Sequence, residues 1–426
     1  MRISIDTRTI KRGDTFLAIK GRRFDGHDFV REALRKGAKK AVVSKIPHLP
    51  PAYRPRLIKV SNTLEVLAEM AGARRAKFGI PLIAVTGSNG KTTAKDMLAR
   101  VLSSRYNVLK NETSKNNFIG LSLTLLGLNA KHEIAVLEMG MNGLGEIEKL
   151  SEIAKPSMGV MTNIGPSHLE GLKSLDNVFK AKAELIKKLP RNAPVFLNID
   201  DEILRKARVS GRKKVYYGIE RRCRFRAENV SYRAGAWSFT VSGERFELPL
   251  LGRHNIYNAL IAIAVSRTLG VPLRDVKKGI AGFRPGRSGR LDRITVRGID
   301  VIDDSYNSNP LSMASALDAL GMYGVSGKKI VVCGDMLELG DKSRFFHEEA
   351  GRDVAERHIY SLITLGRLSR FIHKSAGRRG MENIYHAASH REAARVLRRL
   401  ARPGDAILVK GSRGMKMEKV IEELEK

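Results

Sequence analysis

The sequence predicts an α/β protein of three domains: a small N-terminal α/β domain over residues 1–79, a central doubly wound sheet of the P-loop type over residues 80–288, and a C-terminal Rossmann-like domain over residues 289–426. Three observations lead to this prediction. The 426 residues suffice for two or three domains. Apolar strands and amphipathic helices alternate in two long stretches, as parallel sheets require. A glycine-rich loop stands between an apolar strand and a helix, as in phosphate-binding folds.

The N-terminal domain is expected to contain short strands and two helices. Periodicity predicts strands at 3–6, 15–19 and 41–44 and helices at 29–36 and 64–78. A proline-rich stretch at 47–55 interrupts the pattern, and Gly79-Ile80-Pro81 has the composition of a hinge.

The central domain begins with a strand at 82–85. Further strands are predicted at 134–137, 158–161 and 195–197, followed by an antiparallel insert over about 215–251 and a helix at 255–269. The insert is inferred from residues 237–241, where apolar and polar side chains alternate.

The C-terminal domain repeats the alternation after a join near Pro285-Gly286. Parallel strands are expected at 301–302, 329–333, 362–365 and 406–409, with helices at 312–320, 346–357 and 388–400. Two α/β domains joined by a flexible segment predict a cleft that closes over a substrate.

Composition narrows the functional class. No apolar run approaches the roughly 20 residues of a membrane span, and no signal peptide is evident at the N-terminus. The two cysteines, Cys223 and Cys333, have no metal-ligand spacing, so we expect a reduced, cytoplasmic location. The net charge of +33 is interpreted as a solvated basic surface without a nucleic-acid partner, because no basic stripe is interleaved with aromatic residues.

The loop at residues 86–93 has the composition of a phosphate cradle. Gly87 and Gly90 let the backbone turn so that consecutive N–H groups face one anion, and Lys91 adds a cation. The usual pattern has a glycine where this chain has Val85, so an ordinary strand-to-helix turn remains the alternative. We predict that the loop binds a nucleotide triphosphate.

A magnesium site is predicted beside this loop. Thr92 or Thr93 supplies a hydroxyl, and Glu138 places a carboxylate at the end of a neighbouring strand, where it could also be a surface or capping residue. His168 also follows a strand end, although an ordinary histidine is the alternative. The residue pattern alone indicates only a solvated helix position for Lys182.

Three further polar groups follow strands or begin helices. Asn255 and Asn258 are three residues apart and can present two amides to a base edge, or Asn255 can cap its helix. The cluster at 303–310 collects carboxylates, amides and a hydroxyl, which favours a functional role. Residues 409–418 repeat the strand-then-glycine arrangement with several cations and could hold an anion.

Taken together, these segments resemble the Mur ligase family. The loop Thr86-Gly-Ser-Asn-Gly-Lys-Thr-Thr93 is similar to that family's shortened P-loop, and the resemblance covers nearly the whole chain. One branch of the family is indicated by Phe24-Asp-Gly-His-Asp-Phe29, Asp304-Ser-Tyr-Asn-Ser-Asn-Pro310 with Ser312-Met313, Gly334-Asp-Met-Leu-Glu-Leu-Gly340 and Lys410-Gly-Ser-Arg-Gly-Met415.

The resemblance implies a role for each matching residue. ATP would be bound by Gly87, Ser88, Asn89, Gly90, Lys91, Thr92 and Thr93 at the phosphates, Asn255 and Asn258 at the adenine, Arg290 near the phosphates and Asp304 on the ribose. Two Mg²⁺ ions would be held by Thr92, Glu138, His168 and a carbamylated Lys182, and the catalytic residues would be Lys91, Lys182 and His168. The substrates would contact Thr7, Arg8, Phe24, Asp25, Gly26, His27, Asn116, Asn117, Tyr306, Asn307, Asn309, Lys410, Ser412 and Arg413. Ser308 stands where family members commonly carry alanine, a departure expected to change little.

The activity implied is ATP-dependent amide formation in peptidoglycan synthesis. The branch joins D-alanyl-D-alanine to UDP-N-acetylmuramoyl-tripeptide through an acyl phosphate, and we expect a cytoplasmic monomer. A sibling ligase that adds the third residue and a folylpolyglutamate-type synthetase are alternatives. A basic P-loop NTPase stimulated by nucleic acid is the alternative from a different class.

Overall fold

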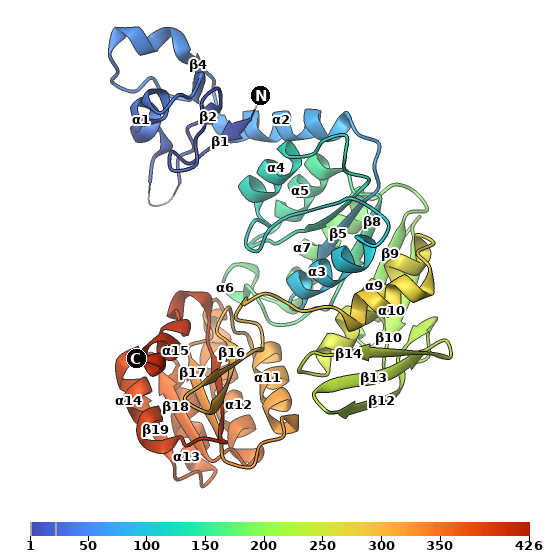
Figure 1. Ribbon diagram of the computed structural model, residues 1–426, viewed down its shortest axis with the longest axis vertical. Helices are drawn as coiled ribbons and strands as arrows, with labels where there is room; N and C mark the ends of the chain where they lie inside the picture. Colours follow the sequence, from blue (N-terminus) through green and yellow to red (C-terminus); the bar gives the residue numbers. More distant parts are fainter. Residues whose placement is uncertain (1, 22–23) are drawn as a thin grey trace.

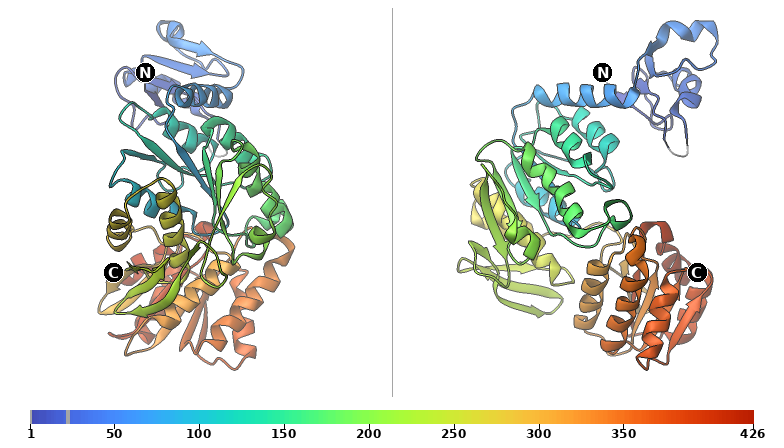
Figure 2. Two further views of the ribbon diagram at one scale, coloured as in Figure 1. Left: turned by 90° about the vertical axis from the view of Figure 1, so that its right-hand side faces the viewer. Right: turned by 180° about the vertical axis from the view of Figure 1, so that it is seen from behind.

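The computed structural model describes residues 2–21 and 24–426 and contains three α/β domains in a row (Figure 1). The N-terminal and C-terminal domains lie at opposite ends of the central domain (Figure 2). The predicted fold class is therefore confirmed, while the domain boundaries at 79/80 and 288/289 remain a prediction. In the part of the chain that is described, no helix combines the length and the apolar character needed to cross a membrane.

The N-terminal domain is a four-stranded parallel sheet in the order β1-β2-β3-β4. Its elements are β1 (Ile3–Ser4), β2 (Thr15–Leu17), η1 (Gly26–Phe29), α1 (Val30–Arg35), β3 (Lys40–Val43), η2 (Pro51–Arg56), β4 (Leu57–Lys59) and α2 (Thr63–Ala76). Asn62 caps α2, since its side chain accepts hydrogen bonds from the N–H groups of Leu64 and Glu65. Helix α2 packs against α4 (Phe118–Leu126) and α5 (Glu146–Ala154), so it connects this domain to the central one.

The central domain is a seven-stranded parallel sheet in the order β11-β10-β9-β8-β5-β7-β6. Its strands are β5 (Leu82–Thr86), β6 (Val108–Lys110), β7 (Ile134–Glu138), β8 (Met158–Met161), β9 (Pro194–Asn198), β10 (Lys213–Gly218) and β11 (Phe225–Arg226). Its remaining helices are α3 (Lys91–Leu102), α6 (Leu169–Leu172), α7 (Leu175–Lys188), α8 (Glu202–Lys206), α9 (His254–Thr268) and α10 (Leu273–Ala281). Alternate residues of β5 enter two different cores, with Leu82 and Ala84 on one face and Ile83 and Val85 on the other. Burial on both faces explains the continuous apolar pattern of this strand.

The prediction of one antiparallel insert over about 215–251 is wrong at its start. Strand β10 pairs in parallel with β9 and belongs to the central sheet. Only β12 (Glu228–Arg233), β13 (Ala236–Val241) and β14 (Glu244–Leu248) form the antiparallel sheet. The insert was inferred from the alternation at residues 237–241, and its bounds were only approximate, so the preceding parallel strand β10 was included in it.

The C-terminal domain is a six-stranded sheet in the order β15-β16-β20-β17-β18-β19, parallel except for β15. Its strands are β15 (Asp292–Val296), β16 (Ile299–Asp304), β17 (Lys329–Gly334), β18 (Ser361–Leu365), β19 (Ile384–Ala387) and β20 (Ala406–Lys410). Its helices are α11 (Pro310–Met322), η3 (Gly340–Lys342), α12 (Ser343–Glu356), α13 (Ser369–Arg378), α14 (His390–Leu400), η4 (Arg413–Met415) and α15 (Glu418–Glu425). Strands β16, β17 and β20 end at the side that faces the central domain, which brings their polar loops to the site.

Candidate functional site

A cavity of about 730 Å³ lies between the central and C-terminal domains. It brings together most of the predicted site residues: Ser88, Asn89, Gly90, Lys91, Thr92, Thr93, Asn116, Asn117, Glu138, His168, Lys182, Asn255, Asn258, Arg290, Asp304, Tyr306, Asn307, Asn309 and Lys410. These residues come from the ends of several parallel strands, which is where open α/β sheets bind ligands.

The glycine-rich loop is held tightly by the end of β8. The Ser88 N–H donates to the Asn163 carbonyl oxygen at 2.9 Å, and the Asn89 N–H donates to Asn163 Oδ1 at 2.9 Å. A Cβ on Gly90 (φ +81°) would lie 2.7 Å from Asn258 Oδ1, so this close approach requires glycine. Gly90 is the N-cap of α3 and no side chain caps this helix, which leaves its first N–H groups available to an anion.

Two lysines that share this cavity repel each other. Lys91 Nζ donates to the carbonyl oxygens of Gly87 at 2.9 Å and Ser88 at 3.1 Å. Desolvation lowers the pKa of Lys91, opposed by the charge of Glu138 and reinforced by that of Arg290. Lys182 is only 2% exposed, and burial together with the like charge of Lys91 places its pKa well below the usual lysine value. The surroundings of Lys182 therefore favour a neutral, nucleophilic amine, contrary to the solvated position that the sequence alone indicated.

Glu138 lies directly opposite the loop, at the end of β7. It is buried, and it accepts hydrogen bonds from Thr92 Oγ1 at 2.7 Å and from Asn116 Nδ2 at 2.7 Å. Within residues 2–21 and 24–426 there is no group of three or more His, Cys, Asp or Glu side chains that could hold a metal ion. A buried carboxylate beside a hydroxyl at a phosphate cradle nevertheless fits Mg²⁺, which binds through one or two carboxylates, phosphates and water.

His168 occupies a strained position at the start of α6. Its backbone is in the left-handed region (φ +54°), and Nδ1 lies 2.8 Å from Oε2 of Glu338 in the C-terminal domain. The two atoms are close, but their relative orientation is not that of a hydrogen bond. This contact with His168 lowers the pKa of Glu338, against the opposing effect of burial.

The two asparagines of α9 are not used as helix caps. Asn255 Nδ2 donates to the Leu251 carbonyl oxygen at 2.7 Å, and Asn258 Nδ2 donates to Asn255 Oδ1 at 2.8 Å. The N-cap position belongs to Arg253, so the capping alternative for Asn255 is wrong. Next to them, burial and the charge of Lys410 lower the pKa of His254 to about 4, which keeps that imidazole neutral at pH 7.

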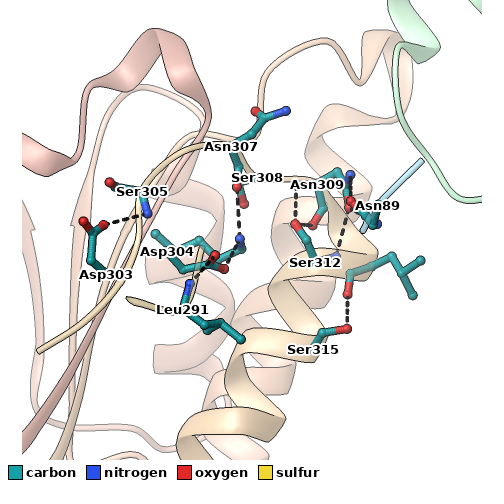
Figure 3. Close-up of polar contacts among 12 residues, drawn as sticks. Asn89, Leu291, Asp303, Asp304, Ser305, Asn307, Ser308, Asn309, Ser312 and Ser315 are labelled. Carbon is teal, nitrogen blue, oxygen red and sulfur yellow. Dashed lines mark hydrogen bonds and ion pairs between the residues drawn. The ribbon is translucent and has the colours of Figure 1, made fainter. Parts of the chain in front are cut away.

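The C-terminal domain contributes a basic and aromatic side to the cavity. Lys410 Nζ pairs with Asp304 Oδ2 and donates to the Asn307 carbonyl oxygen at 3.0 Å. Burial raises the pKa of Asp304 against the opposing charges of Lys410 and Arg290. The guanidinium of Arg290 lies 3.9 Å from the centre of the Tyr306 ring. Figure 3 shows Asp304 and Asn307 of this group, together with the Leu291 N–H that donates to Asp304 Oδ1 at 3.2 Å.

Some predicted residues lie outside the cavity. Ser412 is buried, and its hydroxyl bonds to the Ser308 carbonyl oxygen at 3.2 Å and the Leu337 N–H at 2.8 Å. Arg413 is exposed and pairs with Glu418 at 3.1 Å. The predicted residues Thr7, Arg8, Phe24, Asp25, Gly26 and His27 are all in the N-terminal domain, away from this cavity. There, His27 Nδ1 lies 2.6 Å from Asp25 Oδ1, while Phe24 is 72% exposed.

The cavity also contains functional candidates that the sequence did not single out. Asn163, Asp200 and Asp201 line it and follow strands β8 and β9, and Glu338, in the loop after β17, reaches it only through its contact with His168. Asp201 Oδ2 accepts the Ile164 N–H at 2.6 Å, which fixes the loop that leads to His168. The strand-end rule that singled out Glu138 would have found these residues as well.

Ser308 carries an unsatisfied hydroxyl: it is 3% exposed and its Oγ has no hydrogen-bond partner. Since a buried polar group without a partner costs about 1–3 kcal/mol, Ser308→Ala should raise the free energy of unfolding by about 1 kcal/mol, measured in urea. Ser315→Ala on α11 is the control: Ser315 is half-buried and its hydroxyl donates to the Leu311 carbonyl oxygen at 2.9 Å, so its removal should give no gain in stability. A less stable Ser308→Ala variant would mean that the hydroxyl has a partner.

Comparisons with known proteins were made for the whole chain. The family model of the Mur ligase middle domain matches residues 85–266, that of the Mur ligase glutamate ligase domain matches residues 289–413, and that of the Mur ligase family catalytic domain matches residues 2–75.

Full-length relatives and solved structures agree. UDP-N-acetylmuramoyl-tripeptide–D-alanyl-D-alanine ligase of Bacillus subtilis is 38% identical, covering 99% of this chain and 92% of the relative. The enzyme of the same name from Escherichia coli is 36% identical, covering 82% of this chain and 77% of the relative. MurF from Acinetobacter baumannii has a TM-score of 0.90 at 30% identity, covering 100% of this chain and 93% of that structure. MurF ligase from Thermotoga maritima in complex with ADP has a TM-score of 0.88 at 29% identity, covering 100% of this chain and 97% of that structure.

Proposed function

The chain belongs to the Mur ligase family, and we propose that it is an ADP-forming ligase that joins D-alanyl-D-alanine to UDP-N-acetylmuramoyl-tripeptide in peptidoglycan synthesis. The observation that carries this proposal is the similarity, over nearly its whole length, to ligases of that name. The cavity supports it, because a phosphate loop and a basic, amide-rich surface face each other across one space.

The reaction requires activation of a carboxylate. A carboxylate is anionic and does not react with an amine at neutral pH, so its oxygen first attacks the γ-phosphorus of ATP. The bond to the β–γ bridging oxygen breaks, ADP leaves and an acyl phosphate forms. Lys91 and the uncapped N-terminus of α3 are placed to hold the transferred phosphoryl group and to offset its negative charge.

The second step forms the amide. The amino group of D-alanyl-D-alanine attacks the acyl carbon, the carbon–oxygen bond to phosphate breaks, and the nitrogen loses a proton. We assign Tyr306, Asn307 and Lys410 to the reacting peptide ends, since all three line the C-terminal side of the cavity. A basic cavity also favours the encounter with substrates that are all anionic.

Thr92, Glu138, His168 and Lys182 are the residues that we assign to two Mg²⁺ ions. Bound magnesium supplies charge neutralisation at the phosphates during phosphoryl transfer. Lys182 contributes as a carbamate in this proposal: its depressed pKa makes the neutral amine available to CO₂, and the product is carboxylate-like. Asn255 and Asn258 are assigned to the adenine and Asp304 to the ribose.

The N-terminal domain is proposed to bind the UDP-sugar. Asp25 caps η1 and its pKa is lowered by Lys45 and His27, so it remains an anion that positions the neighbouring loop. A Cβ on Gly26 would lie 2.5 Å from the Ile19 N atom, so this turn requires glycine. We further propose a cytoplasmic location, because ATP and nucleotide-linked precursors are cytoplasmic substrates. We also propose that the chain acts as a monomer, since the residues assigned to the cavity all belong to one chain.

The test is phosphate release by purified protein with ATP, Mg²⁺ and UDP-N-acetylmuramoyl-tripeptide. We expect phosphate release to depend on D-alanyl-D-alanine, with one molecule of the pentapeptide product formed for each phosphate released. Dependence on a single amino acid or on glutamate would favour a sibling ligase or a folylpolyglutamate-type synthetase. Stimulation by DNA or RNA in place of the dipeptide would favour a nucleic-acid-dependent NTPase.

A further inference from the structure

A reciprocal pair of amides joins the phosphate loop to the C-terminal domain. Asn309 Nδ2 donates to Asn89 Oδ1 at 2.8 Å, and Asn89 Nδ2 donates to Asn309 Oδ1 at 3.2 Å (Figure 3). Among the described residues, the one other polar side-chain contact between residues 80–280 and residues 290–426 is that of His168 Nδ1 with Glu338 Oε2 at 2.8 Å. The pair therefore forms a specific connection between the two halves of the cavity.

The loop side of the pair is rigid. The Asn89 N–H is bound by Asn163 Oδ1 at 2.9 Å, and the Asn89 carbonyl oxygen accepts from Thr162 Oγ1 at 2.5 Å and Asn163 Nδ2 at 3.2 Å. With its backbone fixed to the end of β8, Asn89 directs its side chain out of the loop and toward the C-terminal domain. Its amide is satisfied by Asn309 and is not free to serve the nucleotide.

The side chain of Asn309, on the C-terminal side of the pair, is also fixed in place. Asn309 is the N-cap of α11 in a capping box, with its Oδ1 accepting the Ser312 N–H at 2.9 Å and its own N–H donating to Ser312 Oγ at 3.0 Å. Because Oδ1 must accept from the helix, Nδ2 must point at Asn89 Oδ1, so the orientation of the amide is not arbitrary. Asn309 is 8% exposed, and a hydrogen bond is stronger in such a buried, low-dielectric position than in water.

We propose that Asn309 is a positioning residue: through Asn89 it holds the phosphate loop at the distance from the C-terminal domain that the reaction requires. This proposal rests on the proposed function, in which the acyl phosphate forms at the loop and the amine approaches from the side of Tyr306 and Lys410. An error of 1 Å between two such groups can cost about 10²-fold in rate. Asn309 thus acts through Asn89, and it replaces our sequence-based assignment of Asn309 to the substrate.

A second contact lies at the other side of the cavity. The Glu170 N–H donates to the Glu338 carbonyl oxygen at 3.0 Å, beside the contact between His168 and Glu338. Loss of the amide pair should therefore loosen the approach of the two domains at the phosphate loop without separating them.

Asn309→Ser tests the proposal, because serine still caps α11 but is too short to reach Asn89. We expect kcat for ligation to fall about 10²-fold with the KM for ATP within about threefold, and the radius of gyration from small-angle X-ray scattering to increase. Asn89→Ala should show the same changes in kcat and in radius of gyration. The kcat of the double variant should be no lower than that of the less active single variant. Ser308→Ala is the matched control and should retain full activity.

Two results would overturn the proposal. One is Asn309→Ser with kcat within twofold of the parent and an unchanged radius of gyration. The other is a double variant in which the two losses multiply, since the residues would then act separately. If Asn309→Ser fails to fold, Asn89→Ala, which lies outside any helix, gives the same two measurements. The scattering comparison does not need turnover, so it decides this proposal even if the parent protein lacks the proposed ligase activity.

Discussion

Lys91→Ala is expected to lower kcat for ligation about 10³-fold, because it removes the cation that faces the transferred phosphoryl group at the loop. Phosphate release in the presence of both peptide substrates is the measurement. Lys91 Nζ bonds only to the carbonyl oxygens of Gly87 and Ser88, so its loss should leave the fold intact, as judged by circular dichroism.

Arg105→Ala is the matched control for Lys91→Ala. Arg105 is exposed just beyond the end of α3, so its removal takes away one positive charge near the same helix without touching the cavity. We expect full activity from this variant. Substantial ligation by Lys91→Ala, at a tenth of the parent rate or more, would remove Lys91 from the catalytic role.

Lys182→Ala is expected to lower kcat at least about 10²-fold, because the proposed carbamate that completes the magnesium site is lost. Acetate or formate should restore part of the activity, since a small carboxylate can occupy the space that the side chain leaves. Lys180→Ala is the control: Lys180 lies on the same helix, α7, but is exposed and pairs only with Asp176. Full activity of Lys182→Ala, or its loss without any rescue, would contradict the carbamate.

Stability gives an independent test of the environment of Lys182. Its folded-state pKa lies below 10.5, so between that value and 10.5 the unfolded chain binds more protons and stability rises with pH. In bicarbonate-free buffer, Lys182→Met should therefore be inactive yet more stable than the parent at pH 7. The stability advantage should shrink as the pH approaches 10.5. A less stable methionine variant at pH 7 would mean that the ammonium has a partner.

Strands were predictable where they are buried on both faces. Leu82–Thr86 and Ile134–Glu138 have continuous apolar patterns and were located to within one residue. Short edge strands such as Val108–Lys110 were missed, because two or three residues show no periodicity and their pairing depends on tertiary contacts. Helix Ser369–Arg378 was missed as well, although its buried residues Ile372 and Ala376 follow the helical spacing.

The candidate site was predictable mainly from strand ends and from the family resemblance. The strand-end rule found Glu138, but nothing in the sequence marks the burial of Lys182, which arises only when α7 packs against the sheet. The Asn89–Asn309 pair lies beyond any sequence rule, because its members are 220 residues apart and meet only through the docking of two domains. The assignment of Ser412 to the substrate stays a prediction, and the sequence did not indicate that its hydroxyl joins two loops, at the Leu337 N–H and the Ser308 carbonyl oxygen.

The central claim is that the terminal phosphoryl group of ATP is transferred to the C-terminal carboxylate of the tripeptide before the amide forms. The most direct measurement uses UDP-N-acetylmuramoyl-tripeptide with ¹⁸O in that carboxylate, followed by mass spectrometry of the inorganic phosphate released during ligation. Transfer through an acyl phosphate predicts one ¹⁸O atom in each phosphate formed from fully labelled substrate. Phosphate that carries no label, at a normal rate of amide formation, would contradict the account.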